Sequence, residues 1–198
     1  FNDVVDALHR EKNYSEEIAK KLLYTGGYQI YATIDPELQS IVEKVYADTS
    51  NLPYTSSKGE LLQSGATIID NTTGDIVAVA GRVGEREGRF LLDYSTVVRQ
   101  CGSAIKPLSV YAPALDAGVI TPASVIDDYP VEMLGGSIWP VNAYSGYRSI
   151  MTLQDAIRNS SNPTAVRTAI KLTLSASYAF MTENLSFTTL TNDDMTAA

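Results

Sequence analysis

Ser103 and Lys106 lie three residues apart in the run CGSAIKP, directly after a glycine. On a helix this spacing puts two side chains on one face, with Cβ atoms about 5–6 Å apart. A serine hydroxyl is a weak nucleophile until a base takes its proton. A lysine can be that base if burial or a nearby cation keeps it neutral. The pair therefore makes Ser103 a candidate nucleophile and Lys106 its candidate base.

The same pair also has a purely structural interpretation, because serine is a favoured residue at a helix N-cap. Histidine is nearly excluded as the base, because the only one, His9, lies in a charged segment far from Ser103 in the sequence. If a helix begins here, its free N–H groups and positive dipole end would favour an oxyanion. On these residues alone, catalysis and capping both remain open.

A second group of polar residues is Ser160-Ser161-Asn162, which adds hydroxyls and a side-chain amide. It lies in a tight link between two predicted helices. Asn162 stands before Pro163, and an N-cap followed by an N1 proline would explain this order without any chemistry. This motif is therefore also weak when taken alone.

The N-terminal elements are predicted to be mainly helical. A charged segment before residue 25 fits one or two helices with a break near Asn13, and residues 28–34 alternate like a strand. Asp35 and Pro36 then form an N-cap and an N1 proline for a helix. Residues 49–60 are rich in Ser, Thr, Gly and Pro and indicate a connection.

The remaining elements alternate between strands and helices. GATIID and DIVAVAGR flank the turn residues 71–74 and predict a hairpin. Residues 118–148 resemble irregular turns. Thr152 and Asp155 form a capping box for a helix, and another helix starts at Pro163. The pattern predicts an α+β fold.

Composition limits the function further. The 198 residues carry a formal net charge of −8 and are 44% hydrophobic, so a packed core is expected and nucleic acid is a poor partner. The single cysteine, Cys101, cannot form an internal disulfide, and we expect it to be packed rather than reactive. With one histidine it cannot complete a zinc site, and no apolar run reaches the roughly 20 residues that span a bilayer.

Five segments in order resemble the transpeptidase region of class A penicillin-binding proteins. They are GGYQIYATIDPELQ (26–39), GATIIDNTTGDIVAVAGR (65–82), RQCGSAIKP (99–107), WPVNAYSGYRSIMTLQDAIRNSSNPTAVR (139–167) and FTTL (187–190). Their order is far more specific than any single motif. The resemblance implies a penicillin-recognising serine transpeptidase fold, an antiparallel sheet with helices.

The resemblance also implies a role for each site residue. Ser103 would be the acylated nucleophile, Lys106 its base and Ser160 a proton relay, while the Ser103 amide would give half of an oxyanion hole. Asn162 would hydrogen-bond the donor peptide. Trp139, Tyr144 and Tyr147 are expected to pin a loop to the core rather than to line a substrate groove.

The implied reaction is D,D-transpeptidation of peptidoglycan stem peptides that end in D-Ala-D-Ala. β-Lactam antibiotics would acylate the same serine. No cofactor or metal is implied. The protein is expected outside the cytoplasmic membrane of a bacterium, anchored by a segment that is absent from this chain.

The chain departs from the family pattern at its C-terminal side. The family's third motif, Lys-Thr/Ser-Gly, has no counterpart after Lys171. We therefore expect residues 1–60 to be a linker or pedestal region and 61–198 to be the N-terminal part of a transpeptidase domain, cut from a longer protein. Such a fragment would have weak or no activity unless a C-terminal portion or a second chain completes it. The alternative is a non-catalytic binding or sensing module, or a remnant of the fold.

Overall fold

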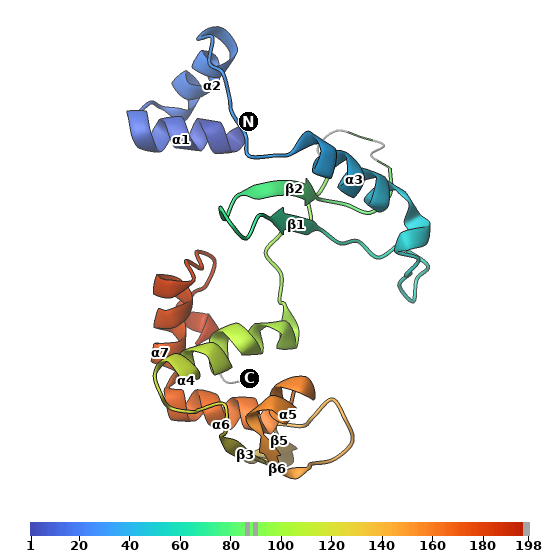
Figure 1. The fold of residues 1–198 in the computed structure, drawn as a ribbon, viewed down its shortest axis with the longest axis vertical. Coiled ribbons are helices and arrows are strands. Elements are labelled where there is room, and N and C mark those ends of the chain that lie inside the picture. The colour runs from blue at the N-terminus through green and yellow to red at the C-terminus, as the bar shows by residue number, and fades with distance from the viewer. Residues whose placement is uncertain (86–87, 89–90, 196–198) are drawn as a thin grey trace. The chain divides into compact units, whose positions relative to one another are not determined.

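The computed structural model describes residues 1–85, 88 and 91–195 of the chain. It separates into two compact units, Phe1–Val97 and Val98–Ala198 (Figure 1). Among the described residues, the first unit has two clusters of buried hydrophobic residues and the second has one.

The first unit opens with a helical hairpin. Helix α1 (Asn2–Lys12) ends at Asn13, which adopts a left-handed conformation with φ of 54°. Helix α2 (Glu16–Thr25) starts at Ser15, whose hydroxyl accepts the Ile18 N–H as an N-cap. The predicted break near Asn13 is confirmed. Three buried side chains join the two helices: Val5, Leu8 and Ala19.

A second element of this unit packs a helix on a hairpin. Helix α3 (Pro36–Ala47) is capped by Asp35, as predicted, because the Asp35 carboxylate accepts the Glu37 and Leu38 N–H groups. Strands β1 (Ala66–Ile69) and β2 (Ile76–Ala80) pair antiparallel, which confirms the predicted hairpin. Figure 1 shows α3 alongside this hairpin. The buried contact consists of Val42, Ala78 and Ala80.

The strand predicted at 28–34 is absent, and this prediction was wrong. The segment is exposed along its length and belongs to no sheet of the described chain. Two hydrogen bonds hold its end beside β2, from the Thr33 hydroxyl to the Ile76 carbonyl at 2.6 Å and from the Asp35 N–H to the Val77 carbonyl at 2.9 Å. Alternation predicts a strand only where a partner strand or core covers one face, and here neither face is covered.

The chain between α3 and β1 is a connection, as its composition predicted. It contains one short 3₁₀ turn (Thr49–Asn51) and an isolated bridge between Thr55 and Leu61. The domain boundary placed after residue 60 stays a prediction.

The second unit begins with a continuous helical segment of changing pitch. A 3₁₀ turn (Gly102–Ile105) leads through Lys106 into a π-helical turn (Pro107–Tyr111) and then helix α4 (Ala112–Asp116). The helix start predicted at Ser103 is confirmed, although its first turn is a 3₁₀ turn.

Proline explains part of this irregularity. Pro113 has no N–H to donate to the carbonyl four residues earlier, that of Ser109. The Ser177 hydroxyl donates to this carbonyl instead, at 2.5 Å. Ser177 belongs to helix α7 (Leu174–Ala179), so the bond ties α7 to the segment that carries Lys106.

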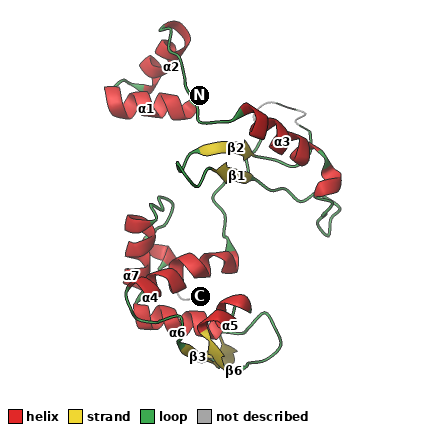
Figure 2. Cartoon of the chain, in the orientation of Figure 1, coloured by secondary structure: helices red, strands yellow, loops and turns green. Residues whose placement is uncertain are grey.

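Residues 118–148 contain strands that the sequence did not predict. Strand β3 (Val125–Asp128) pairs antiparallel with β6 (Ser149–Thr152) (Figure 2). Strand β4 (Glu132–Leu134) forms a hairpin with β5 (Ser137–Trp139). The strands are three or four residues long, and acidic or exposed residues interrupt their apolar pattern. Such short strands give too little alternation to be recognised.

Two helices complete the support of the site. Helix α5 (Leu153–Arg158) is capped by Thr152, whose hydroxyl accepts the Asp155 N–H, and helix α6 (Asn162–Leu172) follows after a tight link. Beyond α7 come a π-helical turn (Phe180–Asn184) and a 3₁₀ turn (Asn192–Asp194). The core of this unit consists of Val110, Tyr111, Ala114, Ile120, Leu153, Ala165, Ala169 and Leu172.

The described chain is an α+β structure with three two-stranded antiparallel sheets. None of its described helices is long and apolar enough to cross a membrane. Within the same residues, no three His, Cys, Asp or Glu side chains are grouped so that they could hold a metal ion.

Candidate functional site

Lys106 meets the link between α5 and α6. Its ammonium nitrogen, Nζ, lies 2.8 Å from the Ser160 carbonyl oxygen, 3.1 Å from Ser160 Oγ and 2.5 Å from Asn162 Oδ1. More than fifty residues of sequence separate the two sides of this contact. The structure thus brings together three of the four residues singled out in the sequence.

Ser103 lies one 3₁₀ turn before Lys106. The Lys106 N–H donates to the Ser103 carbonyl, and residues i and i+3 of a 3₁₀ helix are eclipsed on one side. The Ser103 side chain is exposed, and its hydroxyl makes no hydrogen bond with any described residue. Gly102 directly before it has φ of 56°, a left-handed conformation that favours glycine.

Ser160 adopts a left-handed conformation, with φ of 54°. Its N–H donates to the Ile157 carbonyl at 3.0 Å, and this bond closes the turn that follows α5. The next N–H, that of Ser161, donates to the Ala156 carbonyl at 3.0 Å. The reversal of the chain at Ser160 leaves both its carbonyl and its hydroxyl available to Lys106.

The N-cap of α6 is Ser161 and not Asn162, which corrects the structural interpretation of this motif. The buried Ser161 hydroxyl accepts the Thr164 N–H at 3.3 Å. Asn162 is the first helical residue, so its side chain is not needed as a cap. Asn162 Nδ2 donates to the Val141 carbonyl at 2.6 Å, and because a carbonyl can only accept, Oδ1 must face Lys106.

Behind this link lies a carboxylate that the sequence did not single out. Asp128 ends β3 and is fully buried, with 0% of its surface exposed. Its Oδ1 accepts from Asn142 Nδ2 at 2.9 Å and from Ser161 Oγ at 2.8 Å. Its Oδ2 accepts from the Tyr144 hydroxyl at 2.8 Å and from the Arg148 N–H at 2.7 Å.

Asn142 connects Asp128 to the site. Its Nδ2 donates to Asp128 and to the Gly146 carbonyl, so its Oδ1 is the acceptor that faces Asn162. That oxygen accepts the Asn162 N–H at 2.9 Å. The sequence gives no usable signal for this network, because VIDD is too short to be recognised as a strand and does not show which of its two aspartates is buried.

Burial and hydrogen bonding set the protonation of these groups. Burial lowers the pKa of Lys106 from its ordinary value. Burial alone would raise the pKa of Asp128, but hydrogen bonds from Asn142, Arg148, Ser161 and Tyr144 together outweigh it, and the pKa is lowered. Burial and the bond to Asp128 raise the pKa of Tyr144. Asp128 is therefore a buried anion, and the proton of Lys106 is weakly held.

Two aromatic residues hold the loop before β6. The Tyr144 hydroxyl bonds Asp128, and the Tyr147 hydroxyl donates to the Pro140 carbonyl at 3.1 Å. The expectation that the loop is pinned to the core is confirmed for Tyr144, whereas Tyr147 links two residues of the same loop and Trp139 is the last residue of β5. The guanidinium carbon of Arg148 also lies 4.7 Å from the centre of the Tyr144 ring, a cation–π contact.

Cys101 is exposed, so the expectation that it is packed was wrong. It lies before the first core residue of this unit, Val110, and both of its neighbours, Gln100 and Gly102, are exposed as well.

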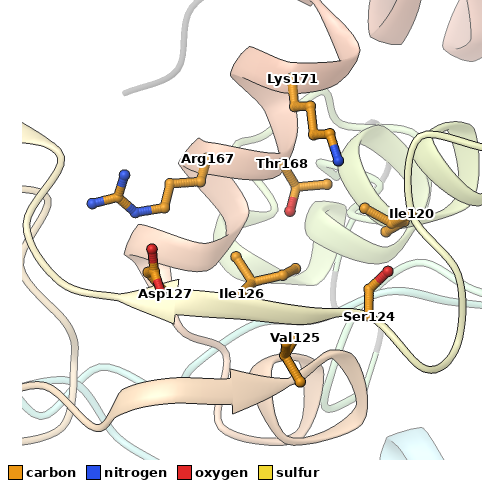
Figure 3. A pocket seen from close by; sticks show the side chains of 8 residues that line it. All are labelled: Ile120, Ser124, Val125, Ile126, Asp127, Arg167, Thr168 and Lys171. Atoms are coloured by element: carbon orange, nitrogen blue, oxygen red, sulfur yellow. The ribbon is translucent and has the colours of Figure 1, made fainter.

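A small pocket of about 210 Å³ lies elsewhere in this unit, between β3 and α6. Ile126 and Asp127 line it from β3, and Arg167, Thr168 and Lys171 line it from α6 (Figure 3). It contains neither Ser103 nor Lys106, and none of the residues of the link between α5 and α6. The Arg167 and Lys171 side chains leave α6 in different directions.

Comparison with known proteins assigns the fold. Residues 64–188 match the family model of the penicillin-binding protein transpeptidase domain. The structure of PonA1 from Mycobacterium tuberculosis in complex with penicillin V superposes with a TM-score of 0.67 at 23% identity, over 89% of this chain and 43% of that one. The predicted fold class is confirmed.

Curated relatives of similar sequence are also penicillin-binding proteins. Penicillin-binding protein 1A of Clostridium perfringens is 35% identical over 193 residues, which cover 91% of this chain and 23% of the relative. Penicillin-binding protein 1F of Bacillus subtilis is 31% identical over 185 residues, covering 93% and 25%. The chain thus spans about a quarter of the length of these relatives. It belongs to the penicillin-binding protein transpeptidase family, as the order of its motifs predicted.

Proposed function

We propose that this chain is part of a serine D,D-transpeptidase that cross-links peptidoglycan stem peptides through an acyl-enzyme on Ser103. The observation that carries the proposal is the contact of Lys106 with Ser160 and Asn162, one 3₁₀ turn after an exposed serine hydroxyl. Family membership supports peptidoglycan transpeptidation as the reaction class.

The donors and acceptors around Lys106 suit a base. The Ser160 carbonyl and Asn162 Oδ1 can only accept, so they take two N–H groups of the amine in either protonation state. The third position faces a hydroxyl, which can accept from an ammonium or donate to a neutral amine. A change in the charge of Lys106 therefore costs no buried hydrogen bond, because the Ser160 hydroxyl can rotate.

Acylation would begin with attack of Ser103 Oγ on the carbonyl carbon of the penultimate D-Ala. The Ser103 hydroxyl proton passes to the Ser160 oxygen, and the Ser160 proton passes to the lone pair of neutral Lys106, as the C–O bond forms. The Ser103 N–H, at the start of the 3₁₀ turn, donates to the oxyanion of the tetrahedral intermediate. The C–N bond then breaks, and the terminal D-Ala leaves as an amine that takes the proton from Lys106 through the Ser160 hydroxyl.

Transfer would reverse these steps with a different amine. An amino group of a neighbouring stem attacks the ester and loses its proton to Lys106. The new amide forms, and Ser103 Oγ leaves with the proton. A β-lactam would acylate Ser103 by the first half of this sequence, with its ring nitrogen as the leaving group.

Asn162 would bind the donor peptide with the part of its amide that remains available. Nδ2 has two N–H groups, and the Val141 carbonyl takes one of them. The second would donate to a backbone carbonyl of the stem. Asn162 would thereby link substrate binding to the base, because the same amide accepts from Lys106.

We also propose a cellular location and a domain arrangement for the protein. We expect the protein to act outside the cytoplasmic membrane of a bacterium, anchored by a segment that is not among these residues. Residues 1–60 would form a linker or pedestal region, and residues 61–198 would belong to the transpeptidase domain.

Covalent labelling tests the nucleophile. Fluorescent penicillin should label the natural protein that carries this sequence, peptide mass spectrometry should place the label on Ser103, and Ser103→Ala should abolish it. Ser109→Ala is the matched control, because Ser109 lies in the same helical segment and its hydroxyl only caps the Ile105 carbonyl. Label that persists in Ser103→Ala would overturn the assignment.

The alternative is a non-catalytic module of the same family. The full-length sequence distinguishes the two, because a Lys-Thr/Ser-Gly motif beyond Ala198 would favour the enzyme and a natural stop codon there would favour this alternative. The natural protein would then bind a β-lactam reversibly or not at all, and no acyl adduct would appear on Ser103.

A further inference from the structure

We propose that Asp128 is a positioning residue that fixes the polarity of the hydrogen bonds around Lys106. The inference deepens the proposed function and rests on it only where acylation is measured. Asp128 does not touch Lys106, Ser160 or Asn162 directly, and it acts through Asn142 and Ser161.

An ionised carboxylate only accepts hydrogen bonds, and Asp128 receives four donors on its two oxygens. Two of these donors lead to the site. Ser161 is held as the N-cap of α6, and Asn142 is held with its Nδ2 toward Asp128.

The direction of each hydrogen bond from Asp128 to the site is then fixed. Because Asn142 Nδ2 faces Asp128, Asn142 Oδ1 accepts the Asn162 N–H. This bond fixes the first residue of α6, whose side chain is held by the Val141 carbonyl on one side and by Lys106 on the other. Ser161 stands between the two residues that contact Lys106, so its cap fixes the backbone between them.

An amide at position 128 cannot replace the carboxylate. If its nitrogen took the place of Oδ2, the N–H of Arg148 would face a donor, and a backbone N–H cannot turn around. If the nitrogen took the place of Oδ1, Asn142 would have to flip and would turn its own Nδ2 toward the Asn162 N–H. Either orientation of the amide leaves one backbone donor without a partner.

No other group in contact with Asp128 among the described residues could replace its negative charge. Tyr144 and Arg148 face it from the loop before β6, and Ser161 and Asn142 complete the shell. Arg148 contributes its backbone N–H, while its guanidinium donates to Asn159 Oδ1. The sole anion of this shell is therefore Asp128 itself.

The first experiment measures the protonation of Lys106 without any reaction. In the natural protein, the Lys106 amine is titrated by NMR of labelled lysine side chains in wild type, Asp128→Asn and Asp127→Asn. Asp127 is the matched control, because it is the adjacent aspartate of β3 and its side chain is exposed.

Asp128→Asn should lower the pKa of Lys106 further, for two reasons with the same sign. It removes a negative charge behind the site, and it disturbs the Asn162 oxygen that accepts from the ammonium. Asp127→Asn should leave the pKa of Lys106 unchanged. An unchanged Lys106 pKa in folded Asp128→Asn would overturn the inference, whether or not the protein reacts with penicillin.

The second experiment measures the second-order rate of penicillin acylation against pH. Misplacement of the base should reduce the maximal acylation rate of Asp128→Asn by roughly 10- to 100-fold. Because the pKa of the base is lower, the part of the pH–rate profile that rises with pH should also move to lower pH. If Asp128→Asn only reduced the amount of folded protein, the rate would fall in proportion to the folded fraction and the pH at which the rate rises would not change. That result would also overturn the inference.

Asn142→Ala keeps the test decisive if Asp128→Asn fails to fold. It interrupts the connection to Asn162 without changing β3, so the pKa of Lys106 should fall in this variant also. A Lys106 pKa equal to that of wild type in Asn142→Ala would contradict the inference. If the pKa of Lys106 falls in these variants but neither they nor the wild type are acylated at Ser103, the positioning role of Asp128 stands and the proposed function fails.

Discussion

At the scale of single residues, the site is determined by which atoms can only accept a hydrogen bond. Two such atoms, the Ser160 carbonyl and Asn162 Oδ1, hold the amine of Lys106, and the Ser160 hydroxyl fills the remaining position. Burial lowers the pKa of Lys106, so its neutral form becomes accessible at a lower pH than for an exposed lysine. These features separate Lys106 from an ordinary surface lysine.

The first prediction concerns the charge of this residue. Lys106→Arg keeps a cation at the site but cannot provide a neutral base near pH 7, because arginine stays protonated. Acylation by penicillin should fall by roughly 10²-fold or more. The rates are measured on the natural protein, with Lys171→Arg as a control outside the site, and a near-normal rate for Lys106→Arg would show that Lys106 is not the base.

The second prediction uses the lowered pKa of Asp128. A carboxyl whose pKa is lower in the folded state stabilises the fold above its unfolded pKa, about 3.9 for aspartate, and this contribution is lost as the pH falls through the folded pKa. At pH 7, Asp128→Asn should unfold more easily by about 1–3 kcal/mol, the usual cost of a buried donor without a partner.

The difference between Asp128→Asn and wild type should therefore begin to shrink below about pH 4, where the carboxyl of the unfolded chain becomes protonated, and it should be lost as the pH falls through the lower pKa of the folded state. Urea unfolding at a series of pH values measures it, with Asp127→Asn for comparison. A constant difference down to pH 2 would mean that the charge of Asp128 does not stabilise the fold.

At the scale of elements, two helix caps differ in what their side chains do. Thr152 caps α5 through the Asp155 N–H and lies exposed. Ser161 caps α6, is fully buried and also donates to Asp128. One serine therefore joins the start of α6 to the end of β3.

The third prediction compares these caps. Thr152→Ala should cost about 1 kcal/mol of unfolding free energy, the usual loss of an N-cap. The Thr152 hydroxyl also donates to the Asp155 carboxylate, but that bond is exposed. Ser161→Ala loses a cap and also a buried hydrogen bond to a charged group, so about 2–4 kcal/mol is expected. Chemical denaturation of both variants measures the difference, and equal losses would show that the bond from Ser161 to Asp128 adds no stability.

At the scale of the whole molecule, Ser103, Lys106, Ser160 and Asn162 all belong to the second compact unit, Val98–Ala198. The candidate site is therefore assembled within one unit, from one helical segment and the link between α5 and α6. No Lys-Thr/Ser-Gly motif follows Lys171 in these 198 residues. In the proposed function, a Lys-Thr/Ser-Gly motif of the natural protein would supply a second oxyanion donor and the third wall of the site.

The fourth prediction follows from that composition. The 198-residue chain alone should be acylated by penicillin at least about 10³-fold more slowly than a longer product of the same gene that includes a third motif. One missing oxyanion donor typically costs about 10² to 10³ in rate, and the loss of the other contacts adds to this. Second-order acylation rates with one β-lactam compare the two, and equal rates would mean that the third motif is dispensable.

The sequence by itself determined the local features and the family. The Asn13 break, the Asp35 and Thr152 caps and the β1–β2 hairpin depend on neighbouring residues, and each was predicted from them. The order of the motifs identified the family because it is a property of the chain and not of its folding.

Tertiary structure alone decided the contacts between distant segments. Residues 28–34 alternate like a strand but have no partner strand, whereas β3 is too short to recognise and still pairs with β6. Ser161 rather than Asn162 became the cap of α6, because Asp128 from β3 holds its hydroxyl from behind. Burial of a carboxylate depends on donors that are brought together only when the chain folds, so no local pattern could assign Asp128 its place behind Lys106.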